Sequence, residues 1–418
     1  MDMKKAVSLL RAFHRDDEQV IAQIRAITTA EWNNILAQLK LLGLAPLFYS
    51  HLANNTFATV VPAYVLQVLL EEYYLHGARN TIILDDLCNL LKALRPSGID
   101  AIVLKGACLA EMVYGDIALR PMQDIDILVR RKDLEDVEQV LIGMGYGPAE
   151  RPPVEEQCRM HHHLIPFTRP GSPTIEVHWS LTPSDCRFPM AMEDLWEKTR
   201  EVHFNEFTAR MLCPVDLLTH LCLHICTNHR FSILEIKNLY DIAQVLRHYG
   251  EEIDWKMLGE STRRFGVGKY VYSTLLVAEK LFGAVLQPEG LAWLDHDDKD
   301  TKIVDIVADY LLDTAAIPLP DVFGQMSGRK SLLQSLGALF HRLFPPYDYL
   351  ARKYGILHSE APSRRSLYLR HWMEALTRGM HLLLHMSLMS KKARATVTRI
   401  KQALIIDDWL KSGSAAQS

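Results

Sequence analysis

Two aspartates, Asp124 and Asp126, stand two residues apart at the start of an apolar run that includes Ile125, Ile127 and Val129. Side chains alternate across a strand, so both aspartates would point to one face and the apolar residues to the other. Two carboxylates side by side repel each other unless a cation lies between them. Mg²⁺ favours such a site, in which a few carboxylates are combined with substrate phosphates. The pair therefore predicts metal-assisted phosphate chemistry.

Glu176 supplies a third carboxylate, within the stretch Ile175-Glu-Val-His-Trp179. On a strand, Glu176 and His178 share one face. If this strand lies beside the one that carries Asp124 and Asp126, three carboxylates converge on one patch. Two-metal phosphoryl or nucleotidyl transfer requires such a patch, with two Mg²⁺ ions or Mn²⁺ in their place. The alternative is a solvated strand edge on which the acids are unconnected.

Lys105 and Gly106 stand where a predicted strand turns into a helix. Glycine lets the backbone come close to a ligand, and a helix N-terminus offers N–H groups and a positive dipole to phosphate. Lys105 and Arg120 would add positive charge for a triphosphate. The alternatives are an ordinary strand–helix turn at Gly106 and an ion pair between Arg120 and one of the two aspartates.

Histidines form two further groups. His161, His162 and His163 begin a predicted strand over residues 161–168 that would pair with the strand of Glu176. His163 or His178 would then contact phosphate or orient Glu176, unless they are partly exposed strand residues.

The second group alternates histidine and cysteine: His220, Cys222, His224, Cys226 and then His229. The histidine pair and the cysteine pair each have the spacing of zinc ligands, but the two pairs face different directions around a helix. We therefore expect buried cysteines and surface histidines, with His224 or His229 as candidate lining of the nucleotide pocket.

The apolar periodicity changes along the chain. Helical spacing predicts helices over residues 1–95, including one that opens at Pro62 and another over 80–94. Strands are expected at 101–104, 125–129, 161–168 and 174–181, with helices at 106–114 and from a cap at Asp133. Helical spacing returns after Pro214, with connectors at 318–330 and 344–347. The fold class is therefore α+β, with a small mixed β-sheet core between N-terminal and C-terminal helical regions.

Composition limits the class of protein. A formal net charge of −4, 49% hydrophobic and 23% charged residues are ordinary for a soluble globular chain and do not fit a surface that binds nucleic acid throughout. The seven cysteines are scattered and no signal peptide or membrane span is apparent, which predicts reduced thiols and a cytoplasmic protein.

Residues 359–418 hold ten Lys or Arg against four Asp or Glu, and a predicted helix there carries Lys391, Arg399 and Lys401. Such a face binds RNA, lipid or a partner, or is simply solvated. Residues 412–418 are expected to form a disordered tail.

The motifs occur in an order that resembles the DNA polymerase beta-like nucleotidyltransferase superfamily, and more narrowly an uncharacterised bacterial nucleotidyltransferase family. The matching elements are Leu104-Lys105-Gly106, Tyr114, Arg120, Asp124-Ile125-Asp126 and Glu176-Val177-His178-Trp179. The resemblance covers about residues 20 to 260. It implies a nucleotidyltransferase fold with Asp124 and Asp126 as metal ligands and Glu176 as the third carboxylate. The wider superfamily has a Gly-Ser or Gly-Gly pair closer to its aspartates, whereas this chain has Gly106-Ala107.

We expect four parts: an N-terminal helical region (1–80), the nucleotidyltransferase core (81–205), a helical domain that closes the cleft (206–290) and a C-terminal helical region of unknown role (291–418). The expected activity is transfer of a nucleoside monophosphate from an NTP to an unidentified acceptor, with release of pyrophosphate. The alternatives are a non-catalytic nucleotide-binding or scaffold protein and a toxin-like enzyme that modifies tRNA or protein. No motif identifies the acceptor, the preferred NTP or an oligomeric state, and a nucleic-acid partner has no support beyond the basic C-terminal helix.

Overall fold

The computed structural model describes residues 2–13, 17–53, 56–147, 152–182, 192–204, 206–313, 350, 366, 368–373 and 391–412. The chain forms two compact units. Met1–Leu312 and Trp409–Ser418 make up the first unit, and Asp313–Asp408 the second. All the residues predicted to do chemistry lie in the first unit.

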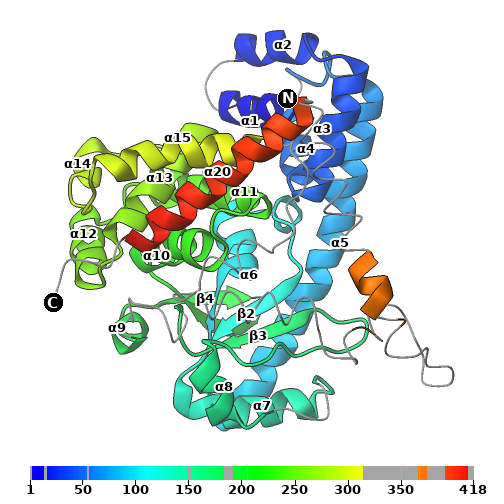
Figure 1. The fold of residues 1–418 in the computed structure, drawn as a ribbon. Helices are drawn as coiled ribbons and strands as arrows, with labels where there is room; N and C mark the ends of the chain where they lie inside the picture. The colour runs from blue at the N-terminus through cyan, green and yellow to red at the C-terminus, as the bar shows by residue number, and fades with distance from the viewer. Residues whose placement is uncertain are drawn as a thin grey trace. The chain divides into compact units, whose positions relative to one another are not determined.

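Helices account for most of the described residues (Figure 1). Their bounds are α1 Asp2–Ala12, α2 Asp17–Arg25, α3 Thr29–Leu41, α4 Ala45–Leu52, α5 Ala63–Leu94, α6 Lys105–Leu109, α7 Leu134–Gly143, α8 Val154–Met160, α9 Met192–Glu197, α10 Pro214–Leu223, α11 Ile236–Tyr249, α12 Trp255–Arg264, α13 Gly268–Phe282, α14 Pro288–Leu291, α15 Asp298–Leu312 and α20 Lys391–Lys411.

Local sequence explains how several helices begin. Thr28 caps α3 in a reciprocal arrangement, in which its side chain accepts from the Glu31 N–H and the Glu31 carboxylate accepts from the Thr28 N–H. Pro214 is the first residue of α10, where its missing N–H costs no hydrogen bond. Asp133 directly precedes α7, as predicted. Its side chain makes no capping hydrogen bond, so the predicted side-chain cap is wrong.

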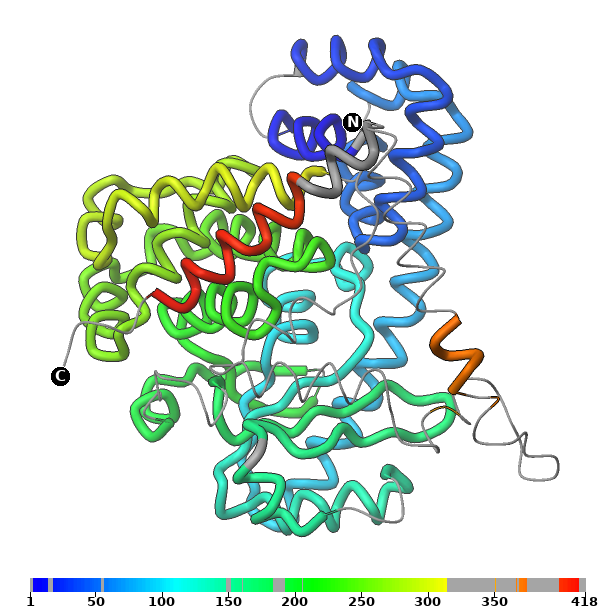
Figure 2. The backbone as a smooth tube through the Cα atoms, viewed as in Figure 1, coloured from blue at the N-terminus to red at the C-terminus, as the bar shows by residue number. Residues whose placement is uncertain are grey.

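Helix α5 is a single helix of 32 residues, where the sequence predicts two. The tube in Figure 2 follows it without interruption. Gly77, near the middle of α5, does not break the helix. The glycine lets Ala118 pack closely against α5, since a Cβ added at Gly77 would lie 3.3 Å from the Ala118 Cβ. Tertiary packing therefore outweighs the weak helix propensity of glycine at this position.

One five-stranded sheet lies among the helices, with strand order β3-β2-β1-β5-β4. The strands are β1 Ile102–Val103, β2 Asp124–Leu128, β3 Thr174–His178, β4 Arg200–Phe204 and β5 Phe207–Met211. β1 is antiparallel to β2 and parallel to β5, β2 is parallel to β3, and β4 is antiparallel to β5. The α+β class with a small mixed sheet is confirmed.

The sheet differs from the sequence prediction in two places. Residues 161–168 do not form a strand but touch β3 only at two isolated bridges, His163 to His178 and Phe167 to Ile175. The β4–β5 hairpin is absent from the prediction, although its residues alternate: Val202 and Phe204 are buried and His203 between them is exposed. Each strand is only five residues long, so the alternation repeats only twice.

The sheet is held between helices. α5 contacts β2, β5 and α7, while α6 begins just after β1 and lies against β2. Ile125 and Ile127 are fully buried, as the alternation predicts for the apolar side of β2. This packing fixes the opposite side of β2, on which the two aspartates lie.

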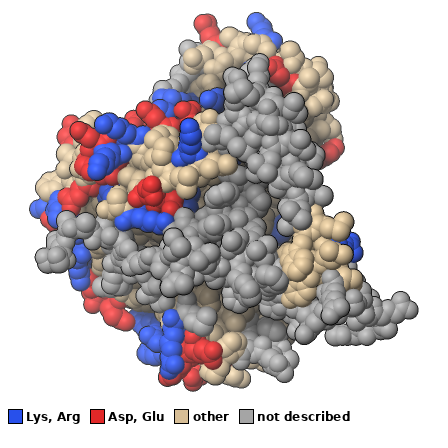
Figure 3. All heavy atoms as spheres, in the orientation of Figure 1, with Lys and Arg blue, Asp and Glu red and all other residues tan. Residues whose placement is uncertain are grey.

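The structure can be compared with the predictions about surface charge, cysteines and membrane spans. On the face drawn in Figure 3, Lys and Arg are interspersed with Asp and Glu over the described residues. The six described cysteines are free thiols, and none of the described helices is long and apolar enough to cross a membrane.

The prediction of a basic face on the C-terminal helix is wrong for Arg399. Arg399 is 8% exposed and donates to the Asp313 carbonyl, so it does not belong to a solvated basic face. The side chain of Lys391, the predicted connectors and the tail after Ser412 lie outside the described residues.

Candidate active site

The parallel pairing of β2 with β3 brings the predicted carboxylates together. In its register Asp126 lies opposite Glu176, Asp124 opposite Thr174, and Leu128 opposite His178. Neighbouring strands lie about 4.8 Å apart, and side chains at paired positions point to the same face. Asp124, Asp126 and Glu176 therefore share one face, as expected if the two strands are neighbours.

Lys105 closes this face from the end of β1. The backbone N–H of Leu104 donates to the Asp126 carbonyl at 3.0 Å, and the Lys105 Nζ lies 3.0 Å from the Asp126 Oδ1. Lys105 has a φ of 41°, in the left-handed region. This conformation costs a residue with a Cβ about 1–2 kcal/mol. A glycine would avoid that cost but would leave Asp126 without its cation, and such strain is common at functional sites.

His178 lies between two of the carboxylates. Its Nε2 is 3.1 Å from the Asp126 Oδ1 and 3.5 Å from the Glu176 Oε2, and its side chain is buried. Of the two predicted roles, orienting Glu176 agrees better with these contacts than a direct contact with phosphate. His163 reaches β3 through its bridge to His178, and its own Nδ1 lies 2.8 Å from the Leu164 carbonyl.

The charges around Asp126 keep it ionised. Burial disfavours its charged form, but the Lys105 ammonium and the hydrogen bond from His178 outweigh this effect and hold its pKa below the usual value. The hydrogen bond from His178 likewise lowers the pKa of Glu176. Burial opposes the charged forms of Lys105 and His178, but the neighbouring carboxylates outweigh it and raise both pKa values. These four groups thus form a charged network.

Asp124 is the exception. Its pKa is raised, first by burial and then by the like charge of Asp126. None of the described side chains forms a hydrogen bond or ion pair with it. An unpaired carboxylate beside two others has the environment that a bound cation would relieve. The oxygen donors therefore fit Mg²⁺, and Asp126, Glu176 and His178 also place their ligand atoms within 4.8 Å of one another.

Arg120 has a different partner from those predicted. Its Nη2 lies 2.8 Å from the Asp241 Oδ2 on α11, and the Tyr114 hydroxyl donates to the Asp241 Oδ1 at 2.7 Å. All three are largely buried. The predicted ion pair of Arg120 with Asp124 or Asp126 is therefore wrong, because Asp241 supplies a closer carboxylate. Gly106 accommodates this arrangement, since a Cβ there would lie 3.0 Å from the Arg120 Nη1.

Asn80 holds the chain that leads into β2. From within α5 its Nδ2 donates to the carbonyls of Ile117 and Arg120, and its Oδ1 accepts from the Met122 N–H at 3.2 Å. Asn80 and Asp241 are the residues that sequence reasoning missed. The available signal was a polar side chain on an otherwise apolar helix face, since both are fully buried.

Replacing Asn80 with alanine should lower the free energy of unfolding by about 1–3 kcal/mol, because the buried Met122 N–H loses its acceptor. Urea denaturation measures this effect. Asn34→Ala, on the exposed side of α3, is the control and should change stability by less than about 0.5 kcal/mol. Equal stability of the two variants would contradict this role for Asn80.

The helix after Pro214 faces this site. Burial lowers the pKa of His220 to about 3, and the charges of Lys105 and Asp126 also act on that pKa. Cys222 and Cys226 are buried as expected, but His220 is only 3% exposed, so the prediction of surface histidines is wrong for it. Every residue of α10 is buried, and the helix packs against α11, α12 and α13, which no single-helix pattern reveals.

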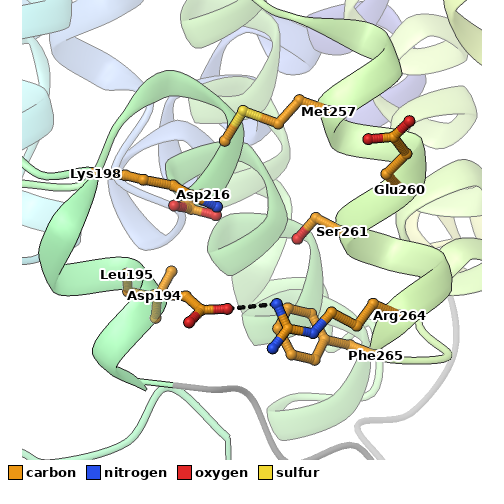
Figure 4. A pocket seen from close by; sticks show the side chains of 9 residues that line it. All are labelled: Asp194, Leu195, Lys198, Asp216, Met257, Glu260, Ser261, Arg264 and Phe265. Carbon is orange, nitrogen blue, oxygen red and sulfur yellow. Dashed lines mark hydrogen bonds and ion pairs between the residues drawn. The ribbon is translucent and has the colours of Figure 1, made fainter.

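A cavity of about 260 Å³ lies elsewhere, between α9, the start of α10 and α12 (Figure 4). Asp194 and Arg264 form an ion pair across its edge, and Asp216 and Lys198 also line it. None of the predicted site residues lines it. The cavity is therefore separate from the carboxylate site.

Comparison with known proteins adds one finding. The model of a family described as "Uncharacterised nucleotidyltransferase" matches residues 28–283. That span includes every residue of the site described above. No curated protein and no solved structure matches the chain.

Proposed function

The chain belongs to this family of uncharacterised nucleotidyltransferases, and we propose that it is a metal-dependent enzyme that transfers a nucleoside monophosphate from an NTP to a hydroxyl or phosphate acceptor, releasing pyrophosphate. Family membership supports nucleotidyl transfer and an NTP substrate. The observation that carries the finer proposal is the β2–β3 register, which sets Asp126 opposite Glu176 on the face that also bears Asp124.

Asp124, Asp126 and Glu176 would hold two Mg²⁺ ions, with Mn²⁺ as a substitute. Such ions lower the pKa of an attacking hydroxyl and neutralise charge on the phosphates. The lowered pKa of Glu176 supports a role as a ligand, because a carboxylate that stays ionised is a weak base. His178 would act as a positioning residue, since it contacts both Asp126 and Glu176.

Lys105 and Arg120 would bind the triphosphate, with the backbone at Gly106 close by. The Lys105 ammonium already lies at the edge of the carboxylate group, where it can neutralise a phosphate oxygen. Arg120 would contribute chiefly through its fixed position, because Asp241 holds most of its guanidinium. The influence of Lys105 on the pKa of His220 supports α10 as one wall of the cleft. We place the enzyme in the cytoplasm, which the free thiols of the described cysteines support.

The test is the fate of the label from two forms of each NTP. The full chain is incubated with MgCl₂, cell extract and either α-³²P- or γ-³²P-labelled NTP. Label from the α position should enter a product, and label from the γ position should appear only in pyrophosphate. Chelation by EDTA should abolish both. Transfer of the γ label to the acceptor would overturn the proposal in favour of a kinase, and calorimetry that detects no NTP binding would favour a scaffold.

A further inference from the structure

Three side chains converge just beyond α10, in a part of the chain that the proposed reaction does not use. They are His224, His229 and Glu235, whose ligand atoms all lie within 4.8 Å of one another. The His229 Nδ1 is 3.3 Å from the Glu235 Oε1, and the imidazole centroids of His224 and His229 are 4.4 Å apart. This group shares no residue with Asp124, Asp126 and Glu176.

The backbone between these side chains is irregular in a way that brings them together. Residues His224–Asn228 form a π-helical turn, a feature that often marks functional sites. Arg230 and Phe231 follow with φ values of 50° and 54°. Each such residue costs about 1–2 kcal/mol in the left-handed region. A regular helix through this segment would carry His229 away from His224.

The carboxylate of this group is held in place by its own partners. The Glu235 Oε2 accepts a hydrogen bond from the Asn238 Nδ2, which leaves Oε1 directed at His229. The Asn238 Oδ1 in turn accepts from the Arg120 Nη2 at 3.4 Å. The Glu235 side chain is only 8% exposed. Partners that orient a ligating carboxylate in this way are typical of protein metal sites.

A buried imidazole, that of His220, lies beside this group. His220 lies one turn before His224, with ring centroids 6.0 Å apart. It is 3% exposed, and neither of its ring nitrogens has a hydrogen-bonding partner among the described residues. Buried polar atoms are rarely left unpaired unless a water or ion completes them.

We propose that His224, His229 and Glu235 bind a Zn²⁺ ion. Two imidazoles and one carboxylate, with a fourth position open, are ligands typical of zinc, whereas Mg²⁺ prefers oxygen alone. The His229 side chain is 42% exposed and gives the ion a route from solvent. The ion would hold the left-handed turn in place and, through Asn238, would fix Arg120. The proposal does not depend on the proposed transferase reaction.

Metal binding by the intact chain tests this proposal. After the protein is freed of metal, Zn²⁺ is titrated by calorimetry, and Co²⁺ is used as a visible-absorption probe. The wild type should bind one Zn²⁺ tightly and unfold at a higher temperature with it. His229→Gln and Glu235→Gln should each weaken this binding by about 100-fold or more, since even secondary partners of a ligand contribute 10–100-fold. His229→Cys should keep the ion, because thiolate is also a zinc ligand.

Two controls separate this site from others. His203 and Glu201 form an exposed pair at 3.7 Å on β4, so His203→Gln and Glu201→Gln should leave Zn²⁺ binding unchanged. Glu176→Gln removes a ligand from the carboxylate site and should retain the tight Zn²⁺ ion. The proposal is overturned if the wild type binds no Zn²⁺ tightly, or if Glu176→Gln alone abolishes the binding. Far-ultraviolet circular dichroism confirms that each variant is folded.

Discussion

Asp124→Asn should lower the rate of nucleotidyl transfer by roughly 1,000-fold or more, while the metal-free protein unfolds at the same or a higher temperature. The loss corresponds to about 4 kcal/mol of transition-state stabilisation, within the range that metal ions supply. Stability is spared because Asp124 makes no hydrogen bond with the described side chains and its pKa is raised by burial and by Asp126. Neutralising it removes a repulsion and breaks no ion pair with the part of the chain that the structure describes.

Asp126→Asn provides the contrast. It should abolish transfer as well, but it should also lower the free energy of unfolding by about 3–5 kcal/mol, because Lys105 and His178 would lose their buried partner. Transfer of α-³²P label and thermal unfolding in EDTA measure the two effects. Activity of Asp124→Asn within tenfold of the wild type would refute the assignment of this residue to the metal site.

Asp241→Asn should lower the free energy of unfolding by about 3–5 kcal/mol, because it leaves the guanidinium of Arg120 buried without a counter-charge. The contrast is an exposed pair, in which the Arg130 Nη1 lies 3.5 Å from the Asp100 Oδ2 and the Asp100 side chain is 54% exposed. Solvent screens such a pair, so Asp100→Asn should change stability by less than about 1 kcal/mol. Urea denaturation of the two variants gives the comparison.

A double variant shows how this ion pair works. Arg120→Met combined with Asp241→Leu should recover a large part of the loss, because no unpaired charge then remains in the core. Activity should not recover with it, since the position of residue 120 and its charge are both part of the proposed triphosphate site. A stability of Asp241→Asn equal to that of Asp100→Asn would show that Arg120 finds another partner.

The sequence carried the chemistry of the site because that chemistry follows a local rule. Alternation along a strand places Asp124 with Asp126, and Glu176 with His178, without reference to the rest of the chain. The same rule identified β2 and β3 and, with the helical periods, the α+β class. It failed for residues 161–168, where apolar residues occur without a full strand partner, and for β4 and β5, which are only five residues long each.

The partners of buried polar groups were decided by the tertiary structure alone. Arg120 and Asp241 are 121 residues apart, and Asn80 reaches the Arg120 carbonyl across 40. Which carboxylate a buried guanidinium meets depends on how helices cross over the sheet, and no periodic pattern records that crossing. The sequence by itself therefore determined which residues carry charge on the face of β2 and β3. The packing of α5 and α11 decided that Arg120 would be held by Asp241, and Asp124 has no hydrogen bond or ion pair with the described side chains. Burial makes each such pairing a matter of several kcal/mol.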